Sequence, residues 1–346
     1  MEFQHEVIDL KENSIFKESE IRPSETREES KIRDIIDTGR LLTRRSEFIE
    51  VSCPACQKSS YNFKFHKNQL RYLECDSCKT LYISPRPTPE ILSWFYSNSA
   101  TYQFWNKVVF PASEGKRREK IFKPRVERIL EICKRNSIKP DSLLEVGCAF
   151  GTFCEEMKST GFFDRILGIE ATSELAETCR QKGIEVKEGL IEDIDFPVNE
   201  KFSVVANFEV IEHLFEPKHF LEKCFGLLDQ KGILVLTCPN IDGFDMKVLG
   251  SNAPSIDHEH LNYFSPDSIR ILMEKVGFRI LEISTPGNLD AEIVRKKIIT
   301  GEFNVDEQPF LKEILINNWK SLGEPFQQFL AANCLSSNMW VVAQKI

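Results

Sequence analysis

The chain has 346 residues, of which 41% are hydrophobic and 28% are charged, and its formal net charge is −8. These values are ordinary for a globular protein that is long enough for more than one domain. The acidic balance argues against a dedicated nucleic-acid-binding protein, which needs a basic face to neutralise phosphates. A small molecule or a protein is therefore the better candidate for the substrate.

The N-terminal sequence MEFQHEVIDLKEN has neither the basic start nor the apolar core of a secretory signal. No stretch approaches 18 continuous apolar residues, so we expect a cytoplasmic protein without a membrane span. In a reducing compartment the 11 cysteines would bind metal or pack in a core. The sequence does not indicate an oligomeric state.

Residues 1–48 are polar and dense in charge, and only IRDIIDTGRLL has a short helical pattern. We expect a mobile or loosely docked arm with one short helix and no catalytic role.

Residues 49–86 contain two cysteine pairs at a spacing typical of zinc ribbons, Cys53-Pro-Ala-Cys56 and Cys75-Asp-Ser-Cys78. Four thiolates predict a tetrahedral zinc site that stabilises a small hairpin, and they leave no open position for a substrate. The zinc would therefore be structural. The alternative is two unrelated redox or packing pairs. We expect His66, which lies between the pairs, to be an exposed residue and not a ligand.

Residues 87–135 are predicted to be a helical connector. Thr88 is a plausible N-cap of the first helix, and Pro124 is expected to break or kink the second. Aromatic residues within 101–111 could form one wall of a substrate site, although such residues more commonly belong to a core.

Residues 136–346 alternate between apolar strands and amphipathic helices, which predicts an α/β domain with a Rossmann-like, doubly wound seven-stranded sheet. Strands are expected at 142–146, 165–170, 184–188, 202–208, 232–238, 278–284 and 338–346. Helices are expected at 151–160, 172–183, 217–232 and 265–278, the last with Ser265 and Pro266 at its start. Residues 287–335 are helical in part and cannot be placed.

The stretch LLEVGCAFGTF ends the first of these strands at Glu145 and turns through Gly147 and Gly151. Ligands of a doubly wound sheet bind at such a turn, and glycine lets them approach the backbone. The match to G-x-G-x-x-G is poor, and the acid would repel a pyrophosphate. It suits a cationic amino-acid moiety, as in S-adenosylmethionine. The alternative is a strand–helix turn without a ligand.

Acidic residues follow the later strands as well. Glu170 ends the second strand, where a carboxylate can bind two ribose hydroxyls. Ile191 and Glu192 follow the third strand and would frame an adenine ring.

With these features in order, residues 141–285 resemble a class I S-adenosylmethionine-dependent methyltransferase, in the group that includes ubiquinone-pathway O-methyltransferases and sugar-modifying enzymes. The resemblance rests on residues 145–151, Glu170, Glu212-His213 and Gln230-Lys231-Gly232. Two departures are Ala149 in place of a glycine and one glycine, Gly232, where two are common. The predicted cofactor-binding residues are Glu145, Gly147, Cys148, Ala149, Gly151, Glu170, Ala171, Ile191, Glu192, Asn207 and Glu209.

Methyl transfer to a hydroxyl requires a group that removes a proton, and a histidine suits this role. The candidates are His213 after the fourth strand and His258 and His260 in the segment DHEHLNYFS. We favour His260, because its segment resembles H-x-x-x-F-S of the family. His213 could instead orient a loop. The cluster His258-Glu259-His260 could also suggest a second, catalytic metal site, which we disfavour.

Residues 241–255 carry several apolar residues and are expected to form a substrate lid or an interface. The ribbon resembles that of sugar-nucleotide methyltransferases and that of ribosomal-RNA methyltransferases. We expect a small-molecule acceptor, a sugar or a hydroxylated metabolite. The alternatives are an RNA methyltransferase, to which the basic run at 116–118 would contribute, and a non-catalytic scaffold.

Overall fold

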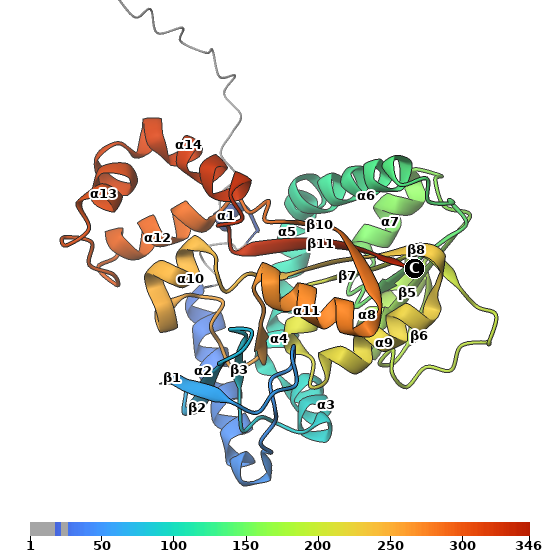
Figure 1. Ribbon diagram of the computed structural model, residues 1–346, viewed down its shortest axis with the longest axis horizontal. Helices are drawn as coiled ribbons and strands as arrows, with labels where there is room; N and C mark the ends of the chain where they lie inside the picture. Colours follow the sequence, from blue (N-terminus) through green and yellow to red (C-terminus); the bar gives the residue numbers. More distant parts are fainter. Residues whose placement is uncertain (1–17, 22–26) are drawn as a thin grey trace, which may run out of the picture.

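The computed structural model describes residues 18–21 and 27–346, and it is organised around a seven-stranded sheet (Figure 1). The strand order is β10-β11-β8-β7-β4-β5-β6, which confirms the doubly wound sheet predicted from the sequence. Strand β11 runs antiparallel to both of its neighbours, and the other pairs are parallel. The strands are β4 (Ser142–Val146), β5 (Arg165–Glu170), β6 (Glu185–Glu188), β7 (Phe202–Phe208), β8 (Leu228–Pro239), β10 (Phe278–Ser284) and β11 (Asn338–Lys345).

Strands β4 and β7 lie at the centre of the sheet, and every residue of both is buried. Continuous apolar runs are what parallel strands need when helices cover both faces. Helix α9 (Pro217–Leu227) packs beside α11 (Pro266–Val276), while α6 (Lys123–Arg135) packs beside α7 (Thr152–Ser159). Because β5 and β7 flank β4, the chain order reverses at β4, and a ligand crevice is expected at its carboxyl end.

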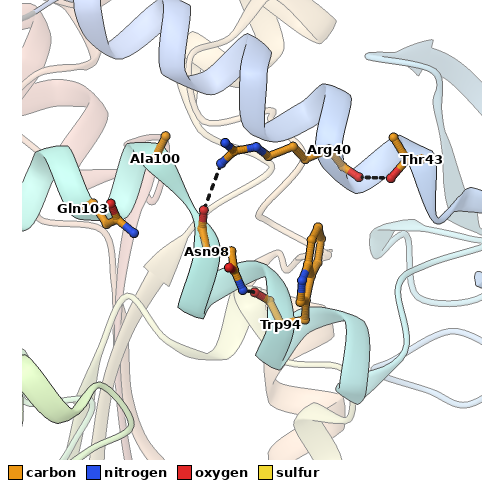
Figure 2. Close-up of a pocket in the computed structure, with 6 residues that line it drawn as sticks. All are labelled: Arg40, Thr43, Trp94, Asn98, Ala100 and Gln103. Carbon is orange, nitrogen blue, oxygen red and sulfur yellow. Dashed lines mark hydrogen bonds between the residues drawn. The ribbon is translucent and has the colours of Figure 1, made fainter.

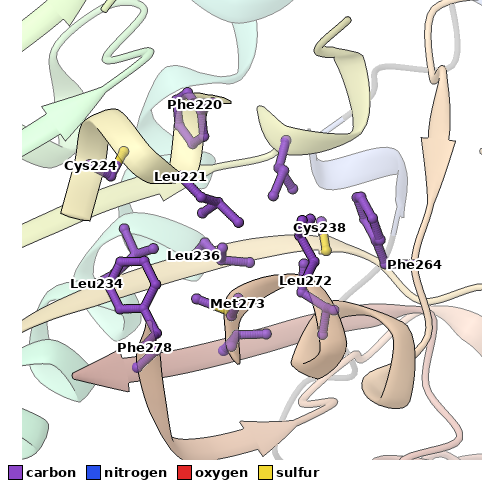
Figure 3. Close-up of a cluster of buried hydrophobic side chains, with 14 of the residues drawn as sticks. Phe220, Leu221, Cys224, Leu234, Leu236, Cys238, Phe264, Leu272, Met273 and Phe278 are labelled. Atoms are coloured by element: carbon purple, nitrogen blue, oxygen red, sulfur yellow. The ribbon is translucent and has the colours of Figure 1, made fainter. Parts of the chain in front are cut away.

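One face of the sheet carries a continuous apolar cluster (Figure 3). Side chains of α9 and α11 meet those of β8 there, and Phe278 closes the cluster at the start of β10. On the other face, residues of α6 and α7 form a second cluster with β4, β7 and β11. The sheet is thus enclosed by helices on both sides. The residues of the first cluster that Figure 3 labels are Phe220, Leu221, Cys224, Leu234, Leu236, Cys238, Phe264, Leu272, Met273 and Phe278.

Most predicted elements occur close to their expected bounds, including α8 (Ser173–Gln181). The helix expected at 217–232 is shorter, because the chain turns into β8 at Leu228, which pairs with Phe202 across a register shift. At the start of α11, Ser265 and Ser268 form a capping box and Pro266 occupies the first turn, as predicted.

The connector is more regular than predicted. After α3 (Pro89–Asn98), which Thr88 caps as expected, residues 100–135 form one helical run. This run contains α4 (Ala100–Phe104), α5 (Phe110–Arg117) and α6, joined by π-helical turns at Trp105–Val109 and Arg118–Phe122. Pro124 lies in the first turn of α6, directly after the second π-helical turn. The expected break at this proline is therefore an irregular turn within a continuing helix.

The four-cysteine ribbon is part of a second sheet that the large domain completes. Strands β1 (Tyr61–Lys67), β2 (Leu70–Cys75) and β3 (Leu81–Ile83) are joined by β9 (Asn262–Tyr263), which pairs antiparallel with β3. The buried guanidinium of Arg86 donates to the Asn262 side chain at 3.0 Å, and the Asn262 amide donates to the carbonyl of Leu214 at 2.7 Å. The ribbon and the α/β domain are therefore joined through buried polar contacts.

The N-terminal segment differs from the expected loosely docked arm. Beyond α1 (Glu18–Ile21), residues Arg27–Thr43 form the 17-residue helix α2, longer than the short helix predicted. Leu41 packs against Ile91 and Phe95, and the buried Asp37 accepts hydrogen bonds from the start of α4. A carboxylate that caps a helix 60 residues further along the chain leaves no local pattern in the sequence. Residues 1–17 and 22–26 lie outside the described residues.

Residues 287–335 form a helical layer with α12 (Asp290–Ile299), α13 (Pro309–Lys312), a π-helical turn at Glu313–Asn317 and α14 (Trp319–Ala332). Helix α12 packs on α10 (Phe244–Leu249), whose Met246 and Leu249 are buried in the shared apolar cluster. The segment 241–255, expected to form a substrate lid or an interface, thus contributes the buried residues Met246, Leu249 and Ala253 to this cluster. No helix in the described part of the chain is long and apolar enough to cross a membrane.

The junction between ribbon and domain gives a first prediction. Asn262→Leu leaves the Arg86 guanidinium and the Leu214 carbonyl without this partner in a buried environment. We expect the free energy of unfolding to fall by about 3 kcal/mol, as measured by denaturant titration. The same change at Asn317, an exposed residue of the helical layer, should alter it by less than about 0.5 kcal/mol. Equal effects at the two sites would contradict this account of the junction.

Candidate functional site

A cavity of about 450 Å³ lies at the carboxyl ends of β4, β5 and β7, where the strand order reverses. Its floor is the turn after β4, and its sides come from Glu170, Glu209, His213, Glu259 and the helical run. A cavity of this size at this place can hold a nucleoside-sized ligand. Six of the eleven predicted cofactor residues line it, namely Glu145, Gly147, Cys148, Ala149, Glu170 and Glu209.

The turn after β4 needs small residues at specific positions. Gly147 has φ +76°, and a Cβ built on it would meet Val210 Cγ2 at 2.8 Å. Ala149, which stands where the resembling family has glycine, also has a positive φ of 47°. A non-glycine residue in this conformation costs on the order of 1 kcal/mol, so the surroundings must hold it in place. The turn keeps its shape despite the departure from the family pattern.

Glu170 provides part of that hold. One carboxylate oxygen accepts the N–H of Ala149 at 2.8 Å, and the other accepts the N–H of Thr172 at 2.9 Å. The side chain thereby links the loops that follow β4 and β5. Burial raises its pKa, and the backbone hydrogen bonds oppose this rise. A carboxylate fixed in this way retains lone pairs for ligand hydroxyls.

Glu145 lies deeper in the cavity. The Cys154 thiol donates to it at 3.0 Å, and burial raises its pKa to about 8. Arg125 opposes this rise, and it also lines the cavity, with its guanidinium 4.5 Å from the centre of the Phe208 ring. The sequence analysis missed Arg125, because nothing distinguishes one arginine among the many basic residues of the expected helix.

The other five predicted cofactor residues do not line this cavity. Gly151 begins α7 with φ +67°, Ala171 is exposed and Ile191 is buried in the main apolar cluster. Glu192 is half-buried after β6. Asn207, at the end of β7, is fully buried, and its side-chain amide has no hydrogen-bond partner among the described residues.

The helical run forms the wall opposite the turn. The residues of this run that line the cavity recur about every four positions over more than 20 residues, whereas an α-helix has 3.6 residues per turn. The two π-helical turns contain more residues per turn and thereby raise the average period to about four, which keeps one face of the run toward the cavity. The stretch 101–111, considered as a possible wall, does line the cavity with Thr101, Tyr102, Trp105, Asn106, Phe110 and Pro111.

The three candidate histidines lie in different surroundings. His213 lines the cavity, but burial lowers its pKa to about 3, so it is a weak proton acceptor. Its ring contacts that of His260 at 4.6 Å between centres, and His260 Nδ1 lies 2.8 Å from the Ser255 carbonyl. Neither His260 nor His258 lines the cavity, and His258 is buried beside α2.

Between these two histidines lies Glu259, which the sequence analysis did not select. Its carboxyl lines the cavity and receives a hydrogen bond from the Tyr102 hydroxyl. Burial and nearby carboxylates raise the pKa of Glu259 to about 8. A carboxyl group with this pKa is a suitable general base near neutral pH. The only sequence feature that could have identified Glu259 is its position between two histidines. A glutamate in a polar segment is more commonly exposed to solvent, so this feature was not sufficient.

The cysteine sulfurs of the ribbon converge as the sequence predicts. Cys53 and Cys78 Sγ are 3.4 Å apart, Cys56 and Cys75 Sγ are 3.3 Å apart, and all four lie within 4.8 Å of one another. All four are buried free thiols. His66 is exposed, as expected.

The two cysteine turns are equivalent in their backbone. Gln57 and Lys79, which follow the second cysteine of each pair, have φ values of 63° and 61°. Their N–H groups donate to the carbonyls of Cys53 and Cys75 at 2.9 and 3.0 Å. A positive φ in a non-glycine residue is unfavourable, so its occurrence at the same position of both turns indicates that the two turns have the same structural role.

A second hollow, of about 460 Å³, lies between α2 and the α3–α4 segment (Figure 2). It is lined by Arg40, Thr43, Trp94, Asn98, Ala100 and Gln103, and Arg40 donates to the Asn98 carbonyl across it at 3.1 Å. None of the predicted site residues borders it. The cavity at the end of β4 is therefore the better candidate for the site.

Comparisons with known proteins point to the same part of the chain. Residues 114–283 match a family model described as a methyltransferase domain. The ubiquinone biosynthesis O-methyltransferase of Cereibacter sphaeroides is 29% identical over 148 residues, which is 39% of this chain and 59% of that protein. The enzyme of the same name from Haemophilus ducreyi is 28% identical over 150 residues, which is 38% and 63%. The match thus spans less than two thirds of these relatives.

Among solved structures, an S-adenosylmethionine-dependent methyltransferase from Archaeoglobus fulgidus aligns with a TM-score of 0.46 and 19% identity, covering 66% of this chain and 94% of that one. The phosphoethanolamine N-methyltransferase 2 of Haemonchus contortus, solved with S-adenosylmethionine, aligns with a TM-score of 0.44 and 16% identity, over 63% and 52%. The family model and the sequence relatives thus show that residues 114–283 are similar to methyltransferase domains.

The turn after β4 gives a second prediction. Gly147→Ala should weaken S-adenosylmethionine binding about tenfold or more, because the added Cβ meets Val210 and the positive φ becomes strained. Titration calorimetry measures the effect. Gly115→Ala is the matched control, since a Cβ at this helical position has nothing within 4 Å and should leave binding unchanged. Wild-type affinity in Gly147→Ala would show that the turn does not contact the ligand.

Proposed function

We propose that this protein transfers a methyl group from S-adenosylmethionine to a hydroxyl oxygen of a small molecule, a sugar or a hydroxylated metabolite. The observation that carries the proposal is the pair of buried carboxyls, Glu145 and Glu170, beside a glycine turn at the switch point of the sheet. The sequence relatives named above are O-methyltransferases of ubiquinone biosynthesis, which favours an oxygen acceptor.

The cavity residues divide into two groups in this proposal. Glu170 accepts the ribose hydroxyls, and the backbone of the turn leaves room for the nucleoside. The aromatic rings of the opposite wall, Tyr102, Trp105 and Phe110, face a cationic sulfonium favourably, because the face of an aromatic ring attracts positive charge. Glu145, at the end of β4, adds negative charge from the floor of the cavity when it is ionised.

S-adenosylmethionine supplies an activated methyl group, so the chain itself must position the acceptor and remove its proton. We assign proton removal to Glu259 in preference to the histidines favoured from the sequence. Glu259 lines the cavity, with a pKa near 8, whereas His213 is a weak base and His260 lies behind it. In this assignment His260 supports the ring of His213.

For the rival function, RNA methylation, the sequence offers the basic run at 116–118, and this run is engaged in ion pairs within the protein. Arg118 of the basic run pairs with Glu155 and Glu156 at 2.5 Å, and Lys116 lies 3.7 Å from Glu119. These charges are neutralised within the protein and offer little to a phosphate backbone. A small acceptor therefore remains the better proposal.

We also propose that Cys53, Cys56, Cys75 and Cys78 hold one structural zinc ion. The sulfurs converge from two equivalent turns, and four thiolates are a ligand set that zinc binds tetrahedrally. Because the ribbon sheet continues into β9, whose residues precede α11 by three positions, the ion would help to fix the segment that carries Glu259.

The third prediction tests the cofactor. We expect calorimetry to detect saturable binding of both S-adenosylmethionine and S-adenosylhomocysteine. Glu170→Ala should weaken both by about tenfold or more, because hydrogen bonds to a charged group contribute about 1.5–3 kcal/mol each. Glu177→Ala, an exposed change on the neighbouring α8, is the control. The absence of binding at millimolar cofactor would favour a non-catalytic scaffold.

The acceptor class can be tested with radiolabelled methyl groups. We expect label in a panel of hydroxylated metabolites and nucleotide sugars, and no label in total RNA at physiological salt. Incorporation into RNA alone would overturn the proposed acceptor.

The fourth prediction concerns the metal. Elemental analysis of the purified protein should give about one zinc per chain. Cys75→Ser should lose the zinc and lower the melting temperature, since metal binding contributes to folding. Cys334→Ser, at an exposed cysteine outside the ribbon, should leave the zinc content and the melting temperature at the wild-type level. Full zinc content in Cys75→Ser would exclude this site.

A further inference from the structure

His258 is a buried side chain that the proposed chemistry does not yet use. Its ring lies beside two carboxylates, with Nδ1 3.4 Å from Asp34 Oδ1 and Nε2 3.8 Å from Glu259 Oε1. The Thr38 hydroxyl is 3.2 Å from Nδ1. Nε2 is buried and has no hydrogen-bond partner among the described residues. A buried nitrogen in this state requires an explanation, because nearly all such groups are paired.

The partners of His258 come from α2, a helix that the methyltransferase domain does not include. Asp34 and Thr38 are one helical turn apart, so both face the ring from the same side of α2. The same helix also holds the cavity wall, since Asp37 accepts the N–H groups of Ala100 and Thr101 at the start of α4. That helix carries Tyr102, which hydrogen-bonds to Glu259.

We propose that α2 is part of the reaction site, and that Asp34, together with the adjacent His258 ring, positions Glu259 and controls its ionisation. Asp34 and His258 are positioning residues, because they do not line the cavity. The inference rests on the proposed function only for the role of Glu259 as the base. It assigns to the N-terminal segment a purpose that its sequence did not indicate.

The three side chains form a compact cluster, in which one polar atom from each of Asp34, His258 and Glu259 lies within 4.8 Å of the other two. The two carboxylates are therefore close enough for their charges to interact directly beside the His258 ring. Asp34 thereby places negative charge near Glu259, which disfavours a second negative charge on that carboxyl.

Glu259 is also surrounded by other groups that titrate or carry charge. Burial is the largest cause of the raised pKa, followed by Asp257 and then Asp34, whereas the Tyr102 hydroxyl lowers it. The groups that face Glu259 are Asp34, Asp37, Tyr96, Tyr102, His213, Asp257, His258 and His260.

The fifth prediction is a carboxyl titration that needs neither cofactor nor acceptor. In full-length protein labelled with carbon-13 at the glutamate carboxyls, the resonance absent from Glu259→Gln belongs to Glu259. Its midpoint should lie near pH 8 in the wild type. In Asp34→Asn the midpoint should fall by about half a unit or more, because a like charge is removed while the size of the side chain is kept. Asp34→Glu should restore it.

Glu29→Gln is the matched control, as it removes one charge from an exposed position of the same helix. It should leave the midpoint unchanged. A midpoint in Asp34→Asn equal to that of the wild type, or the same shift in Glu29→Gln, would overturn the inference. Thermal melts establish that each variant is folded. Failure of the cofactor calorimetry would overturn the proposed function alone, since this titration is made without ligand.

Discussion

The site depends on the placement of one carboxylate, that of Glu170. Its two oxygens hold the loops after β4 and β5 together through backbone N–H groups of Ala149 and Thr172. This link, together with the Cys179 thiol that donates to the Ala149 carbonyl at 3.1 Å, helps to hold Ala149 in its strained conformation. The Glu170 carboxylate also lines the cavity, so its remaining lone pairs can accept hydrogen bonds from a ligand. One side chain thus both shapes the turn and is placed to bind the ligand.

Buried polar contacts join the separate segments of the chain in a similar way. Asn262 and Arg86 connect the ribbon to the α/β domain, and Asp37 connects α2 to the helical run. Each joint satisfies backbone groups that an apolar residue would leave unpaired. Such joints specify where two segments meet more strictly than apolar packing does. The cavity is lined by five separate parts of the sequence, namely residues 101–125, 145–152, 170–175 and 208–213 together with Glu259.

The sequence was sufficient for the sheet, because strands such as FSVVANF are continuous apolar runs with clear ends. The sequence also predicted the position of Glu145 and Glu170, because the carboxyl ends of the parallel strands β4 and β5 lie at the same edge of the sheet. Arg125, Glu259 and Asp34 could not be found in this way, since their roles arise from burial and from partners far away in the chain. The preference for His260 could not take account of the cavity lining, which includes His213 and not His260. Local patterns locate a turn or a cap, but the surroundings of a side chain belong to the folded molecule.

The π-helical turns at Trp105–Val109 and Arg118–Phe122 carry an evolutionary implication. Each holds roughly one residue more than an α-helical turn would, so deleting a single residue there could restore a regular helix and rotate everything beyond it by about 100°. Phe110 or Arg125 would then face another direction, while the sheet and the loops would stay as they are. Related chains could diverge in acceptor preference through such one-residue changes in length, without any substitution among the residues that bind the nucleoside.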